Sequence, residues 1–167
     1  MTKIVFVYLA LCLLSCNKEI KPPNIVLFFV DDLGWQDTSV PFWNETTHFN
    51  QRYHTPNMER LAKEGMKFTQ AYATSVCSPT RVSLMTGMNA ARHRVTNWTL
   101  HKDKIQPMES NHLDLDFPMW NVNGITLDTS VKHAVHATSL PAILKKNGYT
   151  TIHIGKAHFG AIGTSAA

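Results

Sequence analysis

The sequence of 167 residues predicts an α/β fold with a mainly parallel sheet flanked by helices. Strand-like apolar runs at residues 23–30, 67–74 and 149–154 alternate with segments of helical periodicity. The run at 25–30 contains no polar residue, which is typical of a strand buried on both faces of a parallel sheet. No internal repeat or low-complexity tract interrupts this alternation.

The helical segments carry their own boundary signals. A Thr-Pro pair at 55–56 opens an amphipathic stretch that ends at Gly65. A Thr-Ser pair at 138–139 can cap a later helix that runs to residue 148. Residues 93–137 have few periodic apolar positions and many polar ones. A loop of this length is usually functional or disordered, and we expect it to wall a substrate cleft.

The N-terminus predicts an exported protein. Lys3 precedes an apolar run at residues 4–14, which is shorter than the roughly 20 residues that span a bilayer. A basic start, a short apolar core and a small residue after it are typical of a secretory signal, here residues 1–15.

Residues 13–16, Leu-Leu-Ser-Cys, further resemble a bacterial lipoprotein box. The resemblance implies that Cys16 is lipidated and tethers the chain to a membrane through a polar linker at 16–23. The expected location is the periplasm or cell surface of a bacterium. A plain signal peptide with an incidental cysteine is the alternative. Residues 24–167 are long enough for one modest domain.

Charge and cysteine usage narrow the function classes. The net charge of +4 comes from scattered rather than clustered basic residues, which argues against a nucleic-acid partner and suits an anionic substrate. The chain has three cysteines, Cys12, Cys16 and Cys77. Cys12 is removed with the predicted signal peptide and Cys16 is the predicted lipid site, so no disulfide partner remains for Cys77. Cys77 is therefore free for chemistry.

The surroundings of Cys77 are the most specific feature of the chain. Cys77 precedes a predicted helix over 78–87, so its side chain lies where free backbone N–H groups favour negative charge. Pro79 falls in the first turn, and Arg81 lies about one turn on, where its guanidinium can lean back over the cysteine. A buried, inert cysteine or a thiolate nucleophile are the ordinary interpretations of such a residue.

Two further clusters of polar residues follow predicted strands. Asp31 and Asp32 end the first strand, where open α/β sheets place ligands, and paired carboxylates favour a hard divalent cation. A solvated turn is the alternative for an isolated Asp-Asp pair. Lys156 and His158 follow the third strand and are two residues apart, so an extended chain would point both the same way. A lysine can pair with an anion and an imidazole can move a proton.

Together these segments resemble the type I sulfatases, whose fold is that of the alkaline-phosphatase-like superfamily. The resemblance covers residues 23–160 and rests on segment 77–87, on the Asp-Asp pair, and on a Gly-Lys-x-His-x-Gly block at 155–160. Positions 157 and 159 depart from the family pattern, but they alternate away from the charged pair. The resemblance implies a sulfuric ester hydrolase acting on a sulfated carbohydrate or aryl sulfate.

The resemblance also implies a role for each matched residue. Asp31, Asp32 and Cys77 would bind Ca²⁺, with Mg²⁺ as the alternative ion. A maturation enzyme would oxidise Cys77 to formylglycine, whose hydrate attacks sulfur, releases the alcohol and then expels sulfate. Arg81 would hold the formylglycine, Lys156 would grip the sulfate, and His158 would stabilise the nucleophile or its sulfate ester.

Members of this family are longer than the present chain, and their further metal ligands lie beyond the Gly-Lys-x-His block. We therefore expect 24–167 to be the N-terminal part of a catalytic domain whose sheet is incomplete at its C-terminus. Three alternatives stay open: a phosphoester or phosphonate hydrolase of the same superfamily, an inactive truncated fragment, and a hydrolase with a cysteine nucleophile.

Overall fold

The computed structural model describes residues 21–105, 113–114 and 119–166. The chain divides into two units, Met1–Val30 and Asp31–Ala167. In the first unit only residues 21–30 are described. The predicted signal peptide and Cys16 lie outside the described residues. No helix in the described part of the chain is long and apolar enough to cross a bilayer.

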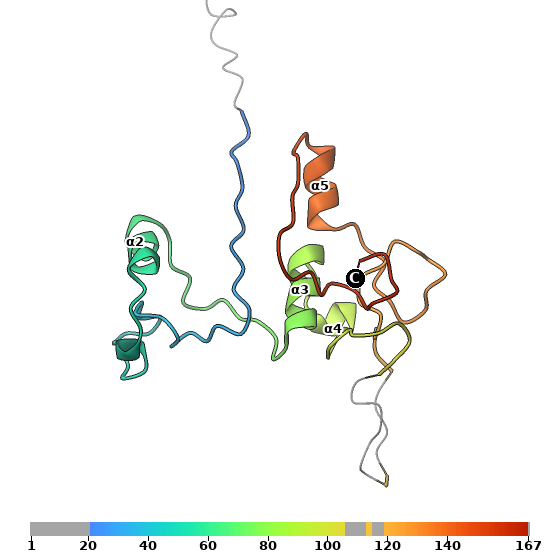
Figure 1. Ribbon diagram of the computed structural model, residues 1–167, viewed down its shortest axis with the longest axis horizontal. Coiled ribbons are helices and arrows are strands. Elements are labelled where there is room, and N and C mark those ends of the chain that lie inside the picture. The colour runs from blue at the N-terminus through green and yellow to red at the C-terminus, as the bar shows by residue number, and fades with distance from the viewer. Residues whose placement is uncertain (1–20, 106–112, 115–118, 167) are drawn as a thin grey trace, which may run out of the picture. The chain divides into compact units, whose positions relative to one another are not determined.

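All three predicted helices form in the second unit (Figure 1). Two of them, α2 and α5, lie outside the cysteine segment. Helix α2, Pro56–Glu64, follows Thr55 and ends at Gly65, as its boundary signals predict. Helix α5, Leu140–Lys146, begins after Ser139 and ends at Asn147, with Pro in its first turn. A short 3₁₀ helix, η1, spans Asn50–Arg52.

Helix α3, Cys77–Thr86, confirms the predicted helix after the cysteine motif. Gly87 ends it in the left-handed conformation at φ 68°, and its N–H donates to Ser83 O at 2.8 Å. Helix α4, Ala90–His93, follows directly and was not predicted; the Asn89 side chain caps it by accepting from Arg92 N. Both α4 and α5 contact α3.

The three predicted strands are not paired into a sheet in the described residues. The β contacts in the described residues are three isolated bridges outside these segments, His101 to Ile162, Gly124 to Gly160, and Ile125 to Val135. The reason is physical: a strand is completed by a neighbour that pairs with its backbone N–H and C=O groups, and the described residues show no such pairing for these segments. Their apolar side chains are consequently exposed, reaching 89% at Val26 and 90% at Ile154.

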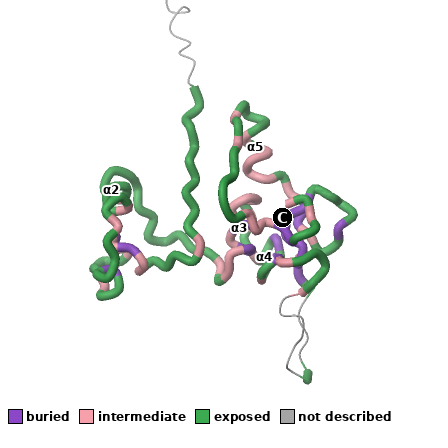
Figure 2. The backbone as a smooth tube through the Cα atoms, viewed as in Figure 1, coloured by how far each residue is buried: buried purple, intermediate pink, exposed green. Residues whose placement is uncertain are grey.

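The core forms in a place that the sequence pattern did not indicate. Val82 of α3 packs with five buried side chains from the predicted cleft loop, namely Val95, Trp120, Val122, Ile125 and Val135. In Figure 2 the buried positions gather mainly around α3, α4 and the segments that follow them. Much of the loop at 93–137 thus packs beneath α3; whether it also walls a cleft stays a prediction.

Gly124 lets two backbone segments approach closely in this core. It has φ +61°, and a Cβ built on it would lie 2.3 Å from Phe159 O and 2.9 Å from Gly160 Cα. We expect Gly124→Ala to lower the free energy of unfolding by about 2 kcal/mol more than Gly148→Ala, measured by urea denaturation. Gly148 is the matched control because it also has positive φ, at +83°, but a Cβ built on it would meet no atom within 4 Å. Equal losses would show that the contact at Gly124 relaxes freely.

His93 is a buried histidine whose protonation state is fixed by its contacts. Its side chain is inside the core at 2% exposure, and its Nδ1 accepts from Val95 N–H at 3.0 Å. The Nε2 nitrogen therefore carries the proton and donates to Ser83 Oγ at 2.8 Å, which ties α4 to α3. Burial lowers the pKa of His93, so the folded protein keeps it neutral.

We expect His93 to make the chain less stable in acid. Between the unfolded pKa of about 6.5 and the lower folded pKa, the unfolded state binds the extra proton, so stability falls as the pH falls. Urea unfolding from about pH 7.5 to about pH 5.5 should show a smaller loss for His93→Gln than for the unmodified chain. The exposed His54, changed to Gln, is the control and should leave the loss unchanged. Equal slopes for His93→Gln and the unmodified chain would contradict this assignment.

Candidate active site

The first turn of α3 presents Cys77 as a free, half-buried thiol. Val76 before it is extended, with φ −133° and ψ 165°, so the chain enters the helix directly at the cysteine. Thr80 Oγ1 contacts Thr74 Oγ1 at 2.6 Å and accepts from Thr74 N at 3.0 Å, which anchors the incoming segment to the helix. The thiol is thereby held at the end of α3 where backbone N–H groups favour negative charge.

His158 faces Cys77 from a distant part of the chain. Its Nδ1 lies 3.2 Å from Cys77 Sγ, and its Nε2 is buried without a hydrogen-bond partner in the described residues. Burial lowers the pKa of His158, and the positive charges of Lys156 and Arg81 lower it further. The imidazole is therefore neutral near pH 7 and can accept a proton.

Asp31 joins both cations of the site. Its Oδ1 lies 3.1 Å from an Arg81 guanidinium nitrogen, and its Oδ2 lies 2.5 Å from Lys156 Nζ. Lys156 and then Arg81 lower the pKa of Asp31, and Asp31 in turn raises the pKa of Lys156. All three groups are charged at neutral pH, so two positive charges surround one negative charge.

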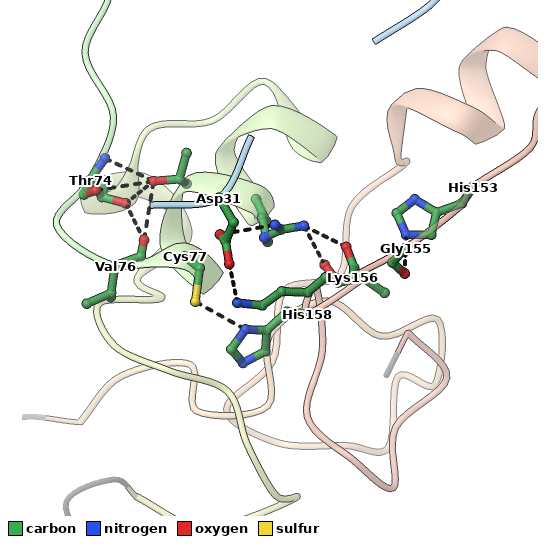
Figure 3. A network of polar contacts seen from close by, with 11 residues as sticks. Asp31, Thr74, Val76, Cys77, His153, Gly155, Lys156 and His158 are labelled. Carbon is green, nitrogen blue, oxygen red and sulfur yellow. Dashed lines mark hydrogen bonds and ion pairs between the residues drawn. The ribbon is translucent and has the colours of Figure 1, made fainter. Parts of the chain in front are cut away.

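Arg81 connects α3 to the segment that carries the other polar groups. Its guanidinium donates to Lys156 O at 2.6 Å and reaches Ala157 O at 3.4 Å, while the side chain is 5% exposed. Figure 3 shows Cys77, Lys156 and His158 pointing toward one another beside Asp31. The structure thus brings together five of the six residues that the sequence singled out.

Asp32, the sixth, does not join this cluster through any hydrogen bond or ion pair found in the described residues. It is exposed and has φ 55°. Both oxygens of Asp31 already pair with cations, and no group of three or more His, Cys, Asp or Glu side chains in the described residues could hold a metal ion. Since Ca²⁺ takes 6–8 oxygen ligands, these residues do not by themselves fit a calcium site. Metal binding by Asp31, Asp32 and Cys77 stays a prediction.

The backbone at His158 also differs from the expectation. The sequence predicts an extended chain that points Lys156 and His158 the same way, and both do face the site. His158, however, has φ 51°, a left-handed conformation that is uncommon outside glycine. The turn at Gly155, with φ 97°, precedes it. The convergence of the two side chains therefore comes from a turn rather than from strand alternation.

Two contacts of α3 were missed by the sequence reasoning. Ser78 is fully buried, and its Oγ accepts from Thr99 N at 3.1 Å. His93 holds the same helix through Ser83. No sequence signal marks these partners, because they lie 21 and 10 residues apart in segments without regular periodicity. Both contacts position the helix that carries Cys77.

Comparison with known proteins identifies the family of this chain. Residues 23–167 match the family model described as Sulfatase. The chain is 34% identical over 143 residues to arylsulfatase G of Mus musculus, covering 85% of this chain and 21% of that protein. It is 32% identical over 160 residues to N-acetylgalactosamine-6-sulfatase of Mus musculus, covering 95% of this chain and 26% of that protein.

A third relative is an uncharacterised sulfatase of Schizosaccharomyces pombe, 34% identical over 145 residues, which cover 85% of this chain and 22% of that protein. The chain thus spans about a fifth to a quarter of the length of the curated relatives it matches. Family membership implies the alkaline-phosphatase-like α/β fold, although the described residues form its helices without its sheet. The match over 23–167 shows that this chain belongs to the sulfatase family.

Proposed function

We propose that this chain supplies the nucleophile and anion-binding part of a sulfuric ester hydrolase acting on a sulfated carbohydrate or aryl sulfate. The observation that carries the proposal is the convergence of Cys77, His158, Lys156 and Arg81 around Asp31. With His158 neutral, two cations outweigh one carboxylate, so the site attracts an anionic group. Lys156 is 46% exposed and can therefore reach a sulfate group from the solvent side.

Each residue has a role in the proposed reaction. Formylglycine formed from Cys77 supplies, in this family, the hydrated aldehyde oxygen that attacks sulfur. His158 directs Nδ1 at the Cys77 side chain, so it can take the proton from a hydroxyl at that position. Lys156 stabilises negative charge on the transferred group, and Arg81 keeps the two segments in register. No step is assigned to a metal ion, because the described residues do not by themselves make up a calcium site; Asp31, Asp32 and Cys77 stay the predicted ligands of a divalent ion.

A cysteine hydrolase is the second candidate, and one distance favours it. Cys77 Sγ and His158 Nδ1 lie 3.2 Å apart, which is the separation of a thiol nucleophile and its base. That function needs an intact thiol at Cys77, whereas a sulfatase needs the oxidised residue. The two candidates are therefore separated by the chemical state of one side chain.

The setting of the enzyme is also proposed. We infer export, processing after residue 15 and a lipid on Cys16, which would place the site in the periplasm or at the surface of a bacterial cell. Metabolic labelling with a radioactive fatty acid tests this; a Cys16→Ala variant that keeps its label would rule out Cys16 as the lipid site.

Cys77→Ala should lower turnover of 4-nitrophenyl sulfate by about 1,000-fold or more, because it removes the nucleophile. The chain is produced with a formylglycine-generating enzyme, and the mass of the peptide that contains residue 77 is measured in the same preparation. Cys16→Ala is the control and should leave turnover of the purified protein unchanged. If Cys77 is unmodified and alkylation abolishes turnover, the cysteine hydrolase is favoured. Faster turnover of 4-nitrophenyl phosphate than of 4-nitrophenyl sulfate would favour a phosphoesterase.

Lys156→Met should lower kcat/KM for 4-nitrophenyl sulfate by about 100-fold, because it removes a charged donor from the developing negative charge. Lys132→Met changes an exposed lysine at the surface and serves as the matched control. Steady-state kinetics on both variants measures the difference. Equal values of kcat/KM for the two variants would remove Lys156 from the sulfate site.

A further inference from the structure

The segment at 36–55, which precedes α2, is closed by its own polar contacts. Asn50 is buried, at 1% exposure, and its side-chain amide donates to Thr38 O at 2.9 Å and to Gln36 O at 3.3 Å. Its Oδ1 accepts from Thr47 N at 3.1 Å and from Thr47 Oγ1 at 2.8 Å. One buried amide therefore ties both arms of the segment together with its full hydrogen-bonding capacity.

A second pair of contacts closes the base of the segment. Ser39 N donates to Thr55 Oγ1 at 3.0 Å, and Thr55 N donates to Ser39 Oγ at 3.1 Å. Val40, at 4% exposure, is the only large apolar side chain of the segment that is buried. The conformation of 36–55 thus depends on hydrogen bonds rather than on burial of its aromatic rings.

The aromatic rings of this segment lie on the surface instead. Trp43 is 64% exposed, Tyr53 41% and Phe49 39%. These exposures differ in origin from those at 25–30, because the backbone of 36–55 is held by local contacts and does not await a strand partner. In Figure 2 this stretch before α2 is largely exposed around a few buried positions.

Two cations lie against these rings. The Arg52 guanidinium carbon is 5.1 Å from the centre of the Phe49 ring, and Lys67 Nζ is 5.8 Å from the centre of the Phe42 ring. Neither cation is within ion-pair distance of a carboxylate among the described residues. A cation held by a ring rather than by a carboxylate keeps its charge available to an anion.

We propose that these side chains form a binding surface for a sulfated glycan, which we call the loop surface: Phe42, Trp43, Phe49, Arg52, Tyr53 and Lys67. The exposed rings stack on the apolar faces of sugar rings, as rigid amphipathic groups at binding sites do. Arg52 and Lys67 then pair with sulfate esters along the glycan. This inference rests on the proposed sulfatase function, to which it adds a second contact with a polymeric substrate.

The polar residues between the rings favour a glycan over a membrane as the partner. Residues 44–46, Asn-Glu-Thr, are all exposed and separate Trp43 from Phe49. Amide, carboxylate and hydroxyl groups can bond the hydroxyls of a sugar, whereas a membrane-binding surface needs a continuous apolar face. A glycan therefore uses both kinds of group that the loop surface presents.

Affinity electrophoresis of a Cys77→Ala chain through gels containing chondroitin sulfate or chemically desulfated chondroitin tests the proposal. Trp43→Ala should weaken retardation about tenfold in both gels, because it removes a stacking ring. Arg52→Ala combined with Lys67→Ala should weaken it about tenfold in the sulfated gel and less in the desulfated gel, whose glycan keeps only its carboxylates, because it removes two surface charge contacts. Vesicles of neutral and anionic lipid, tested by co-sedimentation, complete the comparison.

Trp98→Ala is the matched control, since Trp98 is 44% exposed and lies outside the loop surface. It should leave retardation unchanged, and circular dichroism checks that each variant keeps its helices. Unchanged retardation of both loop variants, an equal loss with Trp98→Ala, or binding to vesicles rather than to the glycan would overturn the proposal. In chains that keep Cys77, the loop variants should not change turnover of 4-nitrophenyl sulfate. Absence of turnover together with intact glycan retention would therefore count against the proposed sulfatase function and leave the loop surface unaffected.

Discussion

The site depends on the buried guanidinium of Arg81. It joins three segments that are far apart in the sequence: α3, the carboxylate of Asp31 and the backbone carbonyls at 156–157. A guanidinium suits this task because its donors point in several fixed directions and its charge is retained at every physiological pH. Without it, α3, which carries the thiol, would lose its link to the backbone at 156–157, next to the imidazole of His158.

The same interaction explains why Asp31 lies among cations. A carboxylate beside one buried arginine offsets its charge, and Lys156 then adds the excess positive charge that an anion can use. The buried contacts of Ser78 and His93 hold the other side of α3. The position of Cys77 is thus fixed from two directions, by charge on one side and by neutral hydrogen bonds on the other.

The sequence predicted the helices and most members of the polar cluster around Cys77 because those signals are local. The Pro-Arg spacing after Cys77 and the glycine that ends the helix both act within ten residues, so α3 forms where expected. The strands could not be verified in the same way, since a strand is completed by a distant partner rather than by its own residues. The core was missed for a related reason: Trp120, Val122 and Ile125 pack from irregular chain, where no periodicity announces burial.

The turn at His158 and the polar closure of 36–55 were also beyond prediction. A non-glycine residue at positive φ is selected by its surroundings, here by the contacts of the imidazole and by the close approach at Gly124. Likewise, Asn50 becomes a structural residue only because four polar atoms of three other residues meet its amide. Nothing in the sequence around His158 indicates its positive φ, and nothing around Asn50 distinguishes it from other asparagines, so these structural roles could not be predicted.

The unpaired apolar segments have a consequence for the chain in solution. Residues 25–30 and the exposed Ile152 and Ile154 combine β-forming side chains with a backbone that has no ladder partner in the described residues. Each is therefore a template that can pair with a matching segment from another molecule. Self-association through these segments would compete with folding as concentration rises, so colloidal behaviour and the polar cluster around Cys77 are set by different parts of the same sequence.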